Sequence, residues 1–340
     1  MNKVNHPIDI LITWVDGADP AWLAEKQKYK AGHGADDRVA RYRDWDNLQY
    51  IFRGIEKFAP WVRNVFLVTW GHLPGWLNTK HPQLKIVTHR DFIPPEYLPT
   101  FSSHAIELNF HRINRLSEHF VYFNDDTFLL KETAATDFFK DGRPCDSAVL
   151  NAHSHDEGRW SLLCEYRAAG IVNKYFKIKD VIAANPDGWF SPLYGDMNRI
   201  SKVLAEFPRL TGIWQHHLPA SILKSTMVEL WEKEGANFDW TCQHKFRTVG
   251  DFNQWVFRNW QLASNYFEPR SVDFGRRFET DDENYLARVK DYIEKQQGHM
   301  ICINDSDPVM GHDEFVAARD AINGSFERIL PEKAVYEVTK

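Results

Sequence analysis

Short apolar runs alternate with segments of helical spacing along the first part of the chain. The runs are rich in β-branched and aromatic residues, which is typical of buried strands. They predict strands at residues 8–14, 64–70, 84–89, 120–123 and, less regularly, 147–151.

Between these runs, the apolar positions recur with the spacing of helices. Leu48, Ile51 and Ile55 fall on one face of a predicted helix over 46–58, and a second helix is predicted over 102–118. A short helix and turn is predicted for the Pro- and Gly-containing segment 74–82. Alternating strands and helices predict βαβ units, and therefore an α/β fold with a mostly parallel sheet covered by helices on both faces.

Beyond about residue 150 the pattern becomes less regular. Residues 152–212 have Gly and Pro interruptions and predict irregular helices. Amphipathic helices are predicted over 218–234 and 250–264, a short strand over 301–305, and a pair of helices over 313–330.

This change of pattern divides the chain into three parts. We expect an α/β core over residues 1–150, a variable helical insertion over 151–212, and a helical part over 213–340 that completes the site and packs on the core.

Composition narrows the class of protein. The 41 Lys and Arg against 47 Asp and Glu give a net charge of −6, which argues against a nucleic-acid-binding protein. The 13 Trp could form carbohydrate-stacking surfaces, although core packing is their commoner use. The four Cys have no pairing pattern and are expected to be buried thiols in a reducing compartment.

No apolar run is long enough for a membrane span, and the apolar run near the start is too short for a signal peptide. We therefore expect a cytoplasmic protein, and peripheral association with the inner face of the membrane stays open.

Polar side chains follow two of the predicted strands at the point where each strand ends. Asn124, Asp125 and Asp126 follow the fourth strand, and Trp14 and Asp16 follow the first. Ligands of open α/β sheets bind beyond the carboxyl ends of the strands, so we expect both groups to face one crevice. Adjacent carboxylates suit Mg²⁺ bound together with phosphate oxygens, although a capping or solvated turn would also explain them.

The start of the predicted helix over 102–118 offers a second polar group. Ser102 or Ser103 can cap the helix, and free N–H groups at a helix start attract phosphate. Glu107, His111 and Arg112 lie further along. An ordinary amphipathic helix is the alternative, and it explains His111 and Arg112 less well.

Two histidines precede the predicted helix at 218. His216 or His217 could act as a general base near neutral pH, although a single histidine is more often structural. Adjacent histidines are poorly placed to share one zinc ion. Arg247 has the fork geometry that suits a phosphate, with a surface salt bridge as the alternative. The crowded segment HSHDEGRW at 153–160 is interpreted as a solvated loop or as the lining of an acceptor site.

With these segments identified, the chain resembles the Stealth family of bacterial capsular-polysaccharide phosphotransferases and animal GlcNAc-1-phosphotransferases. The resemblance follows the order of the four conserved regions of that family, whereas residues 132–212 show none. The resembling segments include IDILITWVDGADPAW, YRDWDNLQYIFRGIEKF, LPTFSSHAIELNFHRI, FVYFNDDTFL, HHLPASILKSTMVELW, HKFRTVGDFNQW, ICINDSD and FERILPEKAVYE.

The resemblance implies an enzyme with a core like that of nucleotide-diphospho-sugar transferases (GT-A-like). Its implied reaction transfers a sugar-1-phosphate from a UDP-sugar such as UDP-GlcNAc to a glycan hydroxyl, and it releases UMP. The family's catalytic aspartate, histidine and arginine fall on Asp126, His217 and Arg247. Ala220 stands where animal enzymes have a second histidine, which leaves His216 as the rival of His217.

On this resemblance, further roles are expected. Asp126 would hold Mg²⁺ or Mn²⁺ with the help of Asp125 and Asp305. Trp14, Asp16, Arg43 and Asn124 would hold the nucleotide and the sugar, and the region 151–212 would recognise the acceptor. The alternatives are a glycosyltransferase that attacks the anomeric carbon and releases UDP, and a nucleotide-sugar-binding module without catalysis.

Overall fold

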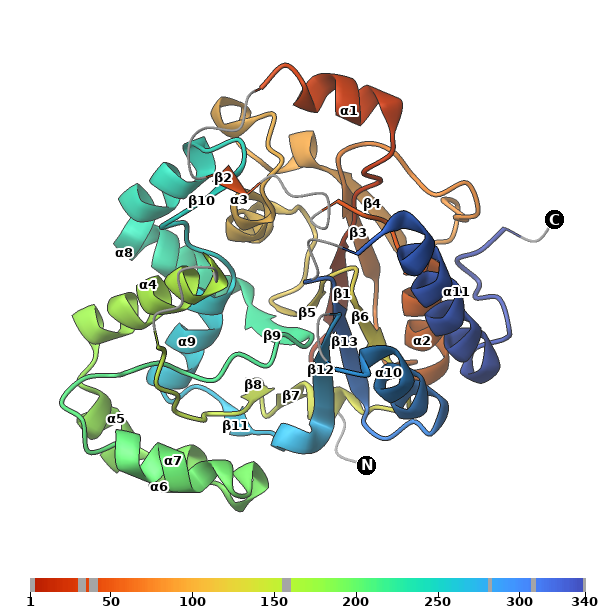
Figure 1. The fold of residues 1–340 in the computed structure, drawn as a ribbon. Helices are drawn as coiled ribbons and strands as arrows, with labels where there is room; N and C mark the ends of the chain where they lie inside the picture. The colour runs from red at the N-terminus through yellow and green to blue at the C-terminus, as the bar shows by residue number, and fades with distance from the viewer. Residues whose placement is uncertain are drawn as a thin grey trace.

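A five-stranded sheet forms the centre of the molecule (Figure 1). The computed structural model describes residues 4–29, 35–36, 42–154, 160–280, 283–306 and 310–338. The sheet has the order β4-β3-β1-β5-β9 and consists of β1 Ile8–Thr13, β3 Val65–Thr69, β4 Leu84–Thr88, β5 His119–Phe123 and β9 Ala220–Leu223. All neighbours pair in parallel except the edge strand β9, which is antiparallel to β5. The predicted α/β class and mostly parallel sheet are confirmed.

The two faces of this sheet belong to two different hydrophobic cores. Ile10 and Ile12 of β1 enter the first core, whereas Leu11 enters the second, because side chains alternate along a strand. The first core includes residues of α2 Leu48–Phe58, α10 Tyr285–Glu294 and α11 His312–Ile329. The second includes residues of α3 Ser103–Leu108, α8 Lys224–Gln243 and α9 Trp255–Ala263. Helices thus cover both faces, as a parallel sheet requires.

A second sheet adjoins the carboxyl end of β5. It has the order β12-β13-β6 and consists of β6 Thr127–Leu129, β12 Gly275–Glu279 and β13 Met300–Asn304. Strand β13 runs antiparallel to β6, with Cys302 opposite Thr127, and parallel to β12. Because β6 follows β5 almost immediately, residues 124–126 lie at the junction of the two sheets.

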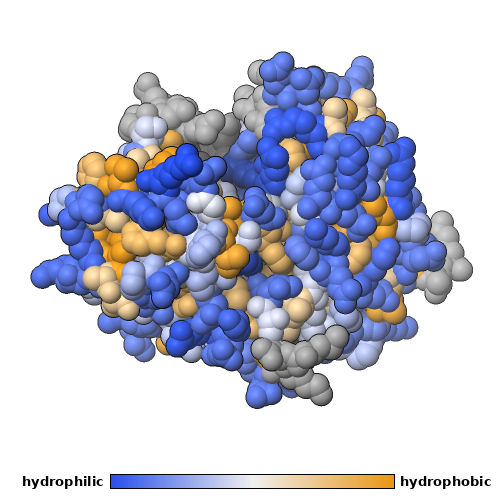
Figure 2. Space-filling model, turned by 90° about the horizontal axis from the view of Figure 1, so that it is seen from below, coloured by the Kyte–Doolittle hydropathy of each residue, from blue (hydrophilic) through white to orange (hydrophobic). Residues whose placement is uncertain are grey.

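The remaining elements surround this centre. Helices α4 Trp160–Tyr175, α5 Ile178–Ala184, α6 Pro186–Trp189 and α7 Met197–Leu204 make up the predicted helical insertion. Figure 2 views the molecule from below and shows apolar side chains gathered on the side where α5–α7 lie. Exposed large apolar residues of this part are Leu193, Ile200, Val203 and Phe207.

Several short elements complete the fold. They are α1 Pro20–Lys26, the pair β2 Ala35–Asp36 and β10 Arg247–Thr248, and the sheet of β7 Phe139–Lys140, β8 Arg143–Asp146 and β11 Glu268–Pro269. Single 3₁₀ turns are His89–Asp91, Pro95–Tyr97, Phe110–Arg112, Ala135–Asp137, Pro192–Tyr194 and Val272–Phe274.

Three predicted helices differ from the structure. The helix predicted over 218–234 begins only at Lys224, because Ala220–Leu223 form the strand that pairs with the free edge of β5. The helix predicted over 102–118 ends at Leu108, where the Asn109 side chain bonds back to the Ala105 carbonyl. The pair predicted over 313–330 is the single helix α11, which passes through Gly324.

Two smaller predictions were also wrong. The segment 74–82 forms turns rather than a helix, and Leu77 makes an isolated bridge with Glu337. The predicted strand at 147–151 is irregular, and only Leu150 makes a bridge, to Ile213. Within 147–151, the Leu150 N–H donates to the Ser201 hydroxyl at 3.1 Å. The strands predicted near 8, 64, 84, 120 and 301 are confirmed.

Candidate active site

Asp126 lies at the turn that carries the chain from β5 to β6. Thr127 closes this turn, because its N–H and its hydroxyl both donate to the Asn124 carbonyl, at 3.2 and 2.8 Å. The Ile303 N–H donates to the Asp126 carbonyl at 2.9 Å and so ties the turn to β13. The backbone of Asp126 is therefore fixed by both sheets.

Only one of the two carboxylate oxygens of Asp126 has a hydrogen-bond partner among the described residues. Its Oδ2 accepts a hydrogen bond from the Cys302 thiol at 3.5 Å, whereas its Oδ1 is buried and has no hydrogen-bond partner among the described residues. Burial raises the pKa of Asp126 to about 6, although the Cys302 hydrogen bond and the nearby Arg277 charge act in the opposite direction. A buried carboxylate oxygen without a partner costs free energy, so its retention points to a ligand.

His217 approaches Asp126 from the loop that precedes β9. Its backbone has the left-handed φ of 49°, which costs free energy for a residue with a Cβ. The Asn124 side-chain nitrogen lies 2.9 Å from Nε2 of His217. Because an amide nitrogen can only donate, Nε2 is the acceptor in this pair and has a lone pair.

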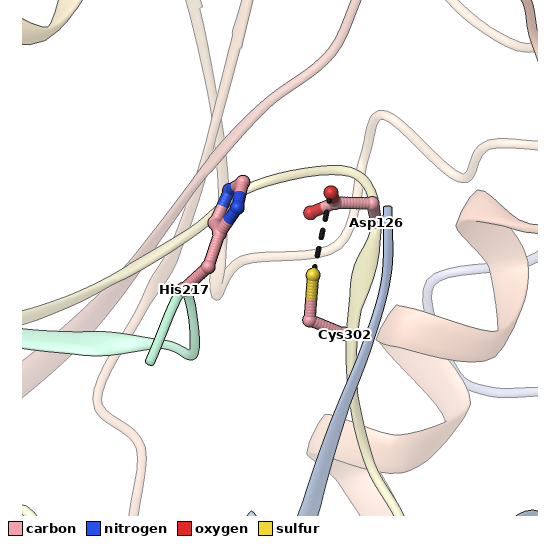
Figure 3. Close-up of side chains that lie close together, drawn as sticks. All are labelled: Asp126, His217 and Cys302. Carbon is pink, nitrogen blue, oxygen red and sulfur yellow. Dashed lines mark hydrogen bonds between the residues drawn. The ribbon is translucent and has the colours of Figure 1, made fainter. Parts of the chain in front are cut away.

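Asp126, His217 and Cys302 converge on one point (Figure 3). One ligand atom of each residue lies within 4.8 Å of the others, and the three come from the β5–β6 turn, the loop before β9, and β13. The sequence-predicted pair of Asp126 and His217 is thus brought together across 91 positions of the chain.

The neighbouring His216 has a different environment. It is buried, its Nδ1 accepts from the Leu218 N–H at 3.1 Å, and its Nε2 lies 3.2 Å from Oδ1 of Asp146. Burial and the nearby Arg258 charge lower the pKa of His216 to about 4. With both nitrogens occupied inside the protein, His216 holds the loop in place, and His217 is the histidine that faces Asp126.

Asp125 and Arg247 lie on the open side of the turn. Enclosure by the surrounding chain, with Asp126 and Asp44 nearby, raises the pKa of Asp125 to about 7, although solvent reaches its side chain. The Arg247 charge acts on Asp125 in the opposite direction, and Arg247 donates to the Ser103 hydroxyl at 2.6 Å. Ser103 and Arg247 thus belong to the neighbourhood of the acidic turn.

Ser102 is fully buried beside them. Its hydroxyl has no hydrogen-bond partner among the described residues, and its N–H donates to the Thr100 hydroxyl at 3.2 Å. The helix start that was predicted to bind phosphate is therefore present, but α3 has only 6 residues and the hydroxyl of its N-cap residue Ser102 is buried.

The end of β1 lies close to the same acidic turn. Trp14 is buried and hydrogen-bonds Asp44, whose pKa is raised by burial and by the carboxylates of Asp46 and Asp16. The Asp16 N–H donates to Nε2 of His72 at 2.8 Å. Asp44 also acts on Asp125, which connects the ends of β1 and β5 as predicted from the sheet topology.

Asp305 and Arg43 pair with each other. The Arg43 guanidinium donates to both oxygens of Asp305 at 2.7 Å, and the Trp45 indole donates to Oδ2 at 3.2 Å. Since both oxygens of Asp305 are used in this way, the structure does not favour its predicted part in a metal site. Arg43 is likewise engaged by Asp305 in this conformation.

Three predicted substrate contacts lie in packed positions. Glu107 is buried and accepts from the Tyr122 hydroxyl at 3.2 Å and from the Gln254 N–H at 3.0 Å. His111 and Arg112 pack against the ring of Trp231, at the end of α3 away from Ser103. These contacts attach α3 and the following turn to their neighbours, and a role of the three residues in substrate binding stays a prediction.

Sequence reasoning missed Cys302 and Arg277. Cys302 is in the apolar run of β13 and reads there as core. Arg277 is paired in register with Cys302, and its positive charge lowers the pKa of Asp126. It forms an ion pair with Glu279, while its Nε is buried without a partner among the described residues. Only the pairing of β12 with β13 reveals these positions, and no local pattern signals it.

The residues of the turn fit a hard divalent cation. Asp126 offers a buried, unpartnered oxygen, and Asp125 offers a second carboxylate that solvent reaches. Mg²⁺ and Mn²⁺ bind such oxygens together with water and phosphate. Asp125 and Asp126 are therefore the residues that could hold the ion, whereas Asp305 could do so only by leaving Arg43.

Comparison with known proteins connects this geometry to a family. The models of Stealth protein conserved region 1 and conserved region 2 match residues 6–34 and 41–145. A capsular polysaccharide phosphotransferase WcwK of Streptococcus pneumoniae is 37% identical over 97% of this chain and 98% of its own length. The chain belongs to the Stealth family. It is an enzyme of the phosphotransferase class.

Other members of the Stealth family are similar over nearly their whole length. The receptor polysaccharide phosphotransferase WefC of Streptococcus oralis is 35% identical over 99% of this chain and 100% of its own. The exopolysaccharide phosphotransferase cps2G of Lactiplantibacillus plantarum is 34% identical over 97% and 96%. The region 2 match also extends to residue 145, beyond residue 131, where the resemblance was expected to pause.

Solved structures resemble this Stealth chain only distantly. The galactosyltransferase LgtC, in complex with donor and acceptor sugar analogs, has a TM-score of 0.39 and 8% identity over 94% of this chain and 95% of its own. A likeness at this level carries no argument about chemistry. Within the described part of the chain, no helix has both the length and the apolar character needed to cross a bilayer.

Proposed function

We propose that this Stealth enzyme transfers a sugar-1-phosphate from a UDP-sugar to a hydroxyl of a capsular or extracellular polysaccharide and releases UMP. Its relatives of similar length are named as phosphotransferases of such polysaccharides. The observation that carries the proposal is the approach of His217 to Asp126, within 4.8 Å, at the carboxyl end of the central strand β5.

His217 is the proposed general base. The acceptor hydroxyl attacks the β-phosphorus of the donor, and its proton passes to the imidazole as the bond to UMP breaks. Nε2 is the nitrogen that would receive this proton, because its contact with the donating Asn124 amide at 2.9 Å requires Nε2 to carry no proton of its own. General base catalysis of this kind contributes typically 10²–10⁴-fold to the rate.

Two arginines on different walls could stabilise the transferring phosphoryl group. Arg247 is held by Ser103 at 2.6 Å beside the acidic turn, and Arg277 extends from β12 with its Nε unpartnered among the described residues. Phosphoryl transfer depends mainly on alignment and charge stabilisation, so a cation on each side of the donor's diphosphate suits this chemistry.

A divalent cation, Mg²⁺ or Mn²⁺, would be held by Asp125 and Asp126. When bound, it supplies charge neutralisation for the diphosphate oxygens. The chain's own part is to place two adjacent carboxylates at a turn that both sheets hold rigid.

The identity of the released nucleotide tests the proposal. The purified protein is incubated with a panel of UDP-sugars, Mg²⁺ and a polysaccharide acceptor, and the products are identified by mass. UMP, together with a phosphodiester in the product, is expected. Release of UDP would instead establish the glycosyltransferase alternative. Donor binding with no turnover on any acceptor would support the non-catalytic module, and D126N provides the blank for each donor.

A further inference from the structure

The donor atoms around Asp126 are of two kinds. Asp125 and Asp126 offer carboxylate oxygens, whereas His217 and Cys302 add a nitrogen and a sulfur. We propose that Asp126, His217 and Cys302 form a binding site for a Zn²⁺-class ion, and that an ion bound there inhibits the enzyme. The inhibition rests on the proposed function, but the metal site does not.

The spacing of the three ligand atoms is close to that of a zinc site. Tetrahedral zinc with bonds of about 2.0–2.3 Å places its ligand atoms roughly 3.5 Å apart. Oδ2 of Asp126 and Sγ of Cys302 are already 3.5 Å apart, and all three atoms lie within 4.8 Å. A movement of roughly 1 Å by the imidazole would complete the geometry.

The protein supports two of these ligands rigidly and leaves the third on a loop. Asp126 directly precedes β6, and Cys302 lies on its partner strand β13, with the Ile303 N–H bonded to the Asp126 carbonyl at 2.9 Å. His217 lies on the loop before β9, and solvent reaches both His217 and Asp126. This arrangement gives an incoming ion an entry path and one adjustable ligand.

The donor set discriminates between metals. Mg²⁺ takes oxygen ligands, whereas zinc and similar ions favour imidazole nitrogen and thiolate sulfur. Three protein ligands would leave a fourth position for water. As the metal–sulfur bond forms, the Cys302 thiol releases its proton to solvent.

Inhibition follows from the identity of the ligands. Zinc would occupy the imidazole lone pair that the acceptor proton needs and would draw the Asp126 carboxylate inward. The same two side chains cannot serve the soft ion and the transfer reaction at once.

Cobalt(II) chloride tests the site directly, because a cobalt–thiolate bond gives an ultraviolet charge-transfer absorption. The intact wild-type protein is titrated without Mg²⁺ or donor. We expect the band in wild type, its loss in C302S, and its retention in C242S. Cys242 is the matched control, since it is equally buried and its sulfur contacts the Asn109 amide.

Zn²⁺ inhibition is then measured at saturating Mg²⁺, with UMP release as the readout. We expect inhibition of wild type and C242S that a chelator reverses, and a 10–100-fold higher Zn²⁺ concentration for half-inhibition of C302S. If C302S does not fold, H217Q replaces it in the cobalt titration alone, and its cobalt affinity is expected to fall about as much.

Absence of the thiolate band in folded wild type, or its survival in C302S, overturns the metal site whatever the activity. If the band behaves as expected but Zn²⁺ leaves transfer unchanged, the inhibitory part is overturned. If no sugar-phosphate transfer occurs with any donor, the proposed function fails, while the cobalt spectrum still decides the site.

Discussion

Asp146 and Asp126 show how differently this chain treats its charges. Asp146 is surrounded by partners: Arg258 Nη2 donates to its Oδ1 at 2.8 Å, Arg258 Nε lies 2.6 Å from Oδ2, and His216 lies 3.2 Å away. Asp126 has a thiol on one oxygen and nothing on the other among the described residues.

The pKa values of the two groups reflect this contrast. Burial raises the pKa of both carboxyls, but the Arg258 charge and the His216 hydrogen bond hold the pKa of Asp146 well below its ordinary value. Asp126, without such a cation in contact, has its pKa raised to about 6. A satisfied buried charge stabilises a structure, whereas an unsatisfied one persists where a ligand needs it.

The largest effect is expected from replacing these two residues with asparagine. D126N should lose at least about 10³-fold in transfer rate and keep or gain stability, because it removes a carboxylate that the fold does not satisfy. D146N should instead lose about 3–5 kcal/mol of unfolding free energy, because it leaves Arg258 buried without its counter-charge. Urea unfolding and initial rates of UMP release measure both.

If D126N and D146N behave alike, the proposed difference between the two aspartates is wrong. Equal destabilisation would show that Asp126 is a structural residue, and full activity in D126N would remove it from the chemistry. D146N has to be assayed at a temperature where it remains folded, so that lost stability is not mistaken for lost catalysis.

His216 and His217 differ in the same way as Asp146 and Asp126, with smaller expected effects. H217Q should lower kcat about 10²–10⁴-fold and leave donor binding close to wild type, because it removes the base and not the binding groups. H216Q should mainly lower stability, because His216 holds Asp146 and accepts from the Leu218 N–H. Donor binding is measured by calorimetry, and kcat by UMP release.

A reversal of these two profiles would reassign the base to His216. The control for both variants is the thermal unfolding midpoint, measured in the same buffer.

Much of the fold could be predicted because the central strands are buried on both faces. Such strands form compact apolar runs, and β1, β3 and β5 are visible for that reason. β9 was missed because its ASIL run is only four residues long and α8 begins at the very next residue, Lys224. Its strand conformation depends on the free edge of β5, which is a tertiary feature.

The candidate site was predictable where it lies at strand ends. Asp126 follows an apolar run and therefore marks a crevice, and family resemblance indicated His217. Cys302 and the Arg43–Asp305 pair were not predictable from local pattern. Each depends on which strands or loops lie side by side, and sequence spacing does not specify that.

Arg276 and Arg277 of β12 are a further pair of neighbours with different environments. Arg277 is in register with Cys302 and its charge acts on Asp126, whereas Arg276 is exposed and lies over the Phe278 ring. R277Q should lower kcat/KM about 10–100-fold through lost phosphate stabilisation, and R276Q should stay near wild type. Similar losses in both would point to general surface charge, and no loss in either would exclude Arg277 from the site.

His111 provides the most demanding test, because it resembles Asp126 in one respect only. Its Nδ1 is buried without a partner among the described residues, yet its ring packs on Trp231 away from the crevice. If unsatisfied groups always marked function, H111F would impair transfer. We expect H111F to keep wild-type activity at pH 7, because phenylalanine preserves the ring packing.

The pH dependence of stability separates the two interpretations of His111. Burial, followed by the Arg112 charge, lowers its pKa from 6.5 to about 4 in the folded protein. As the pH falls from 6.5 to 4, the unfolded chain binds a proton at His111 and the folded protein does not. The free energy of unfolding of wild type therefore decreases as the pH falls below 6.5. H111F has no such titrating group. Between pH 7 and pH 4, its free energy of unfolding should therefore decrease by on the order of 3 kcal/mol less than that of wild type. Urea unfolding across this range measures the difference. If unfolding free energy depends on pH in the same way in both proteins and H111F has lost transfer activity, His111 is a substrate-binding residue.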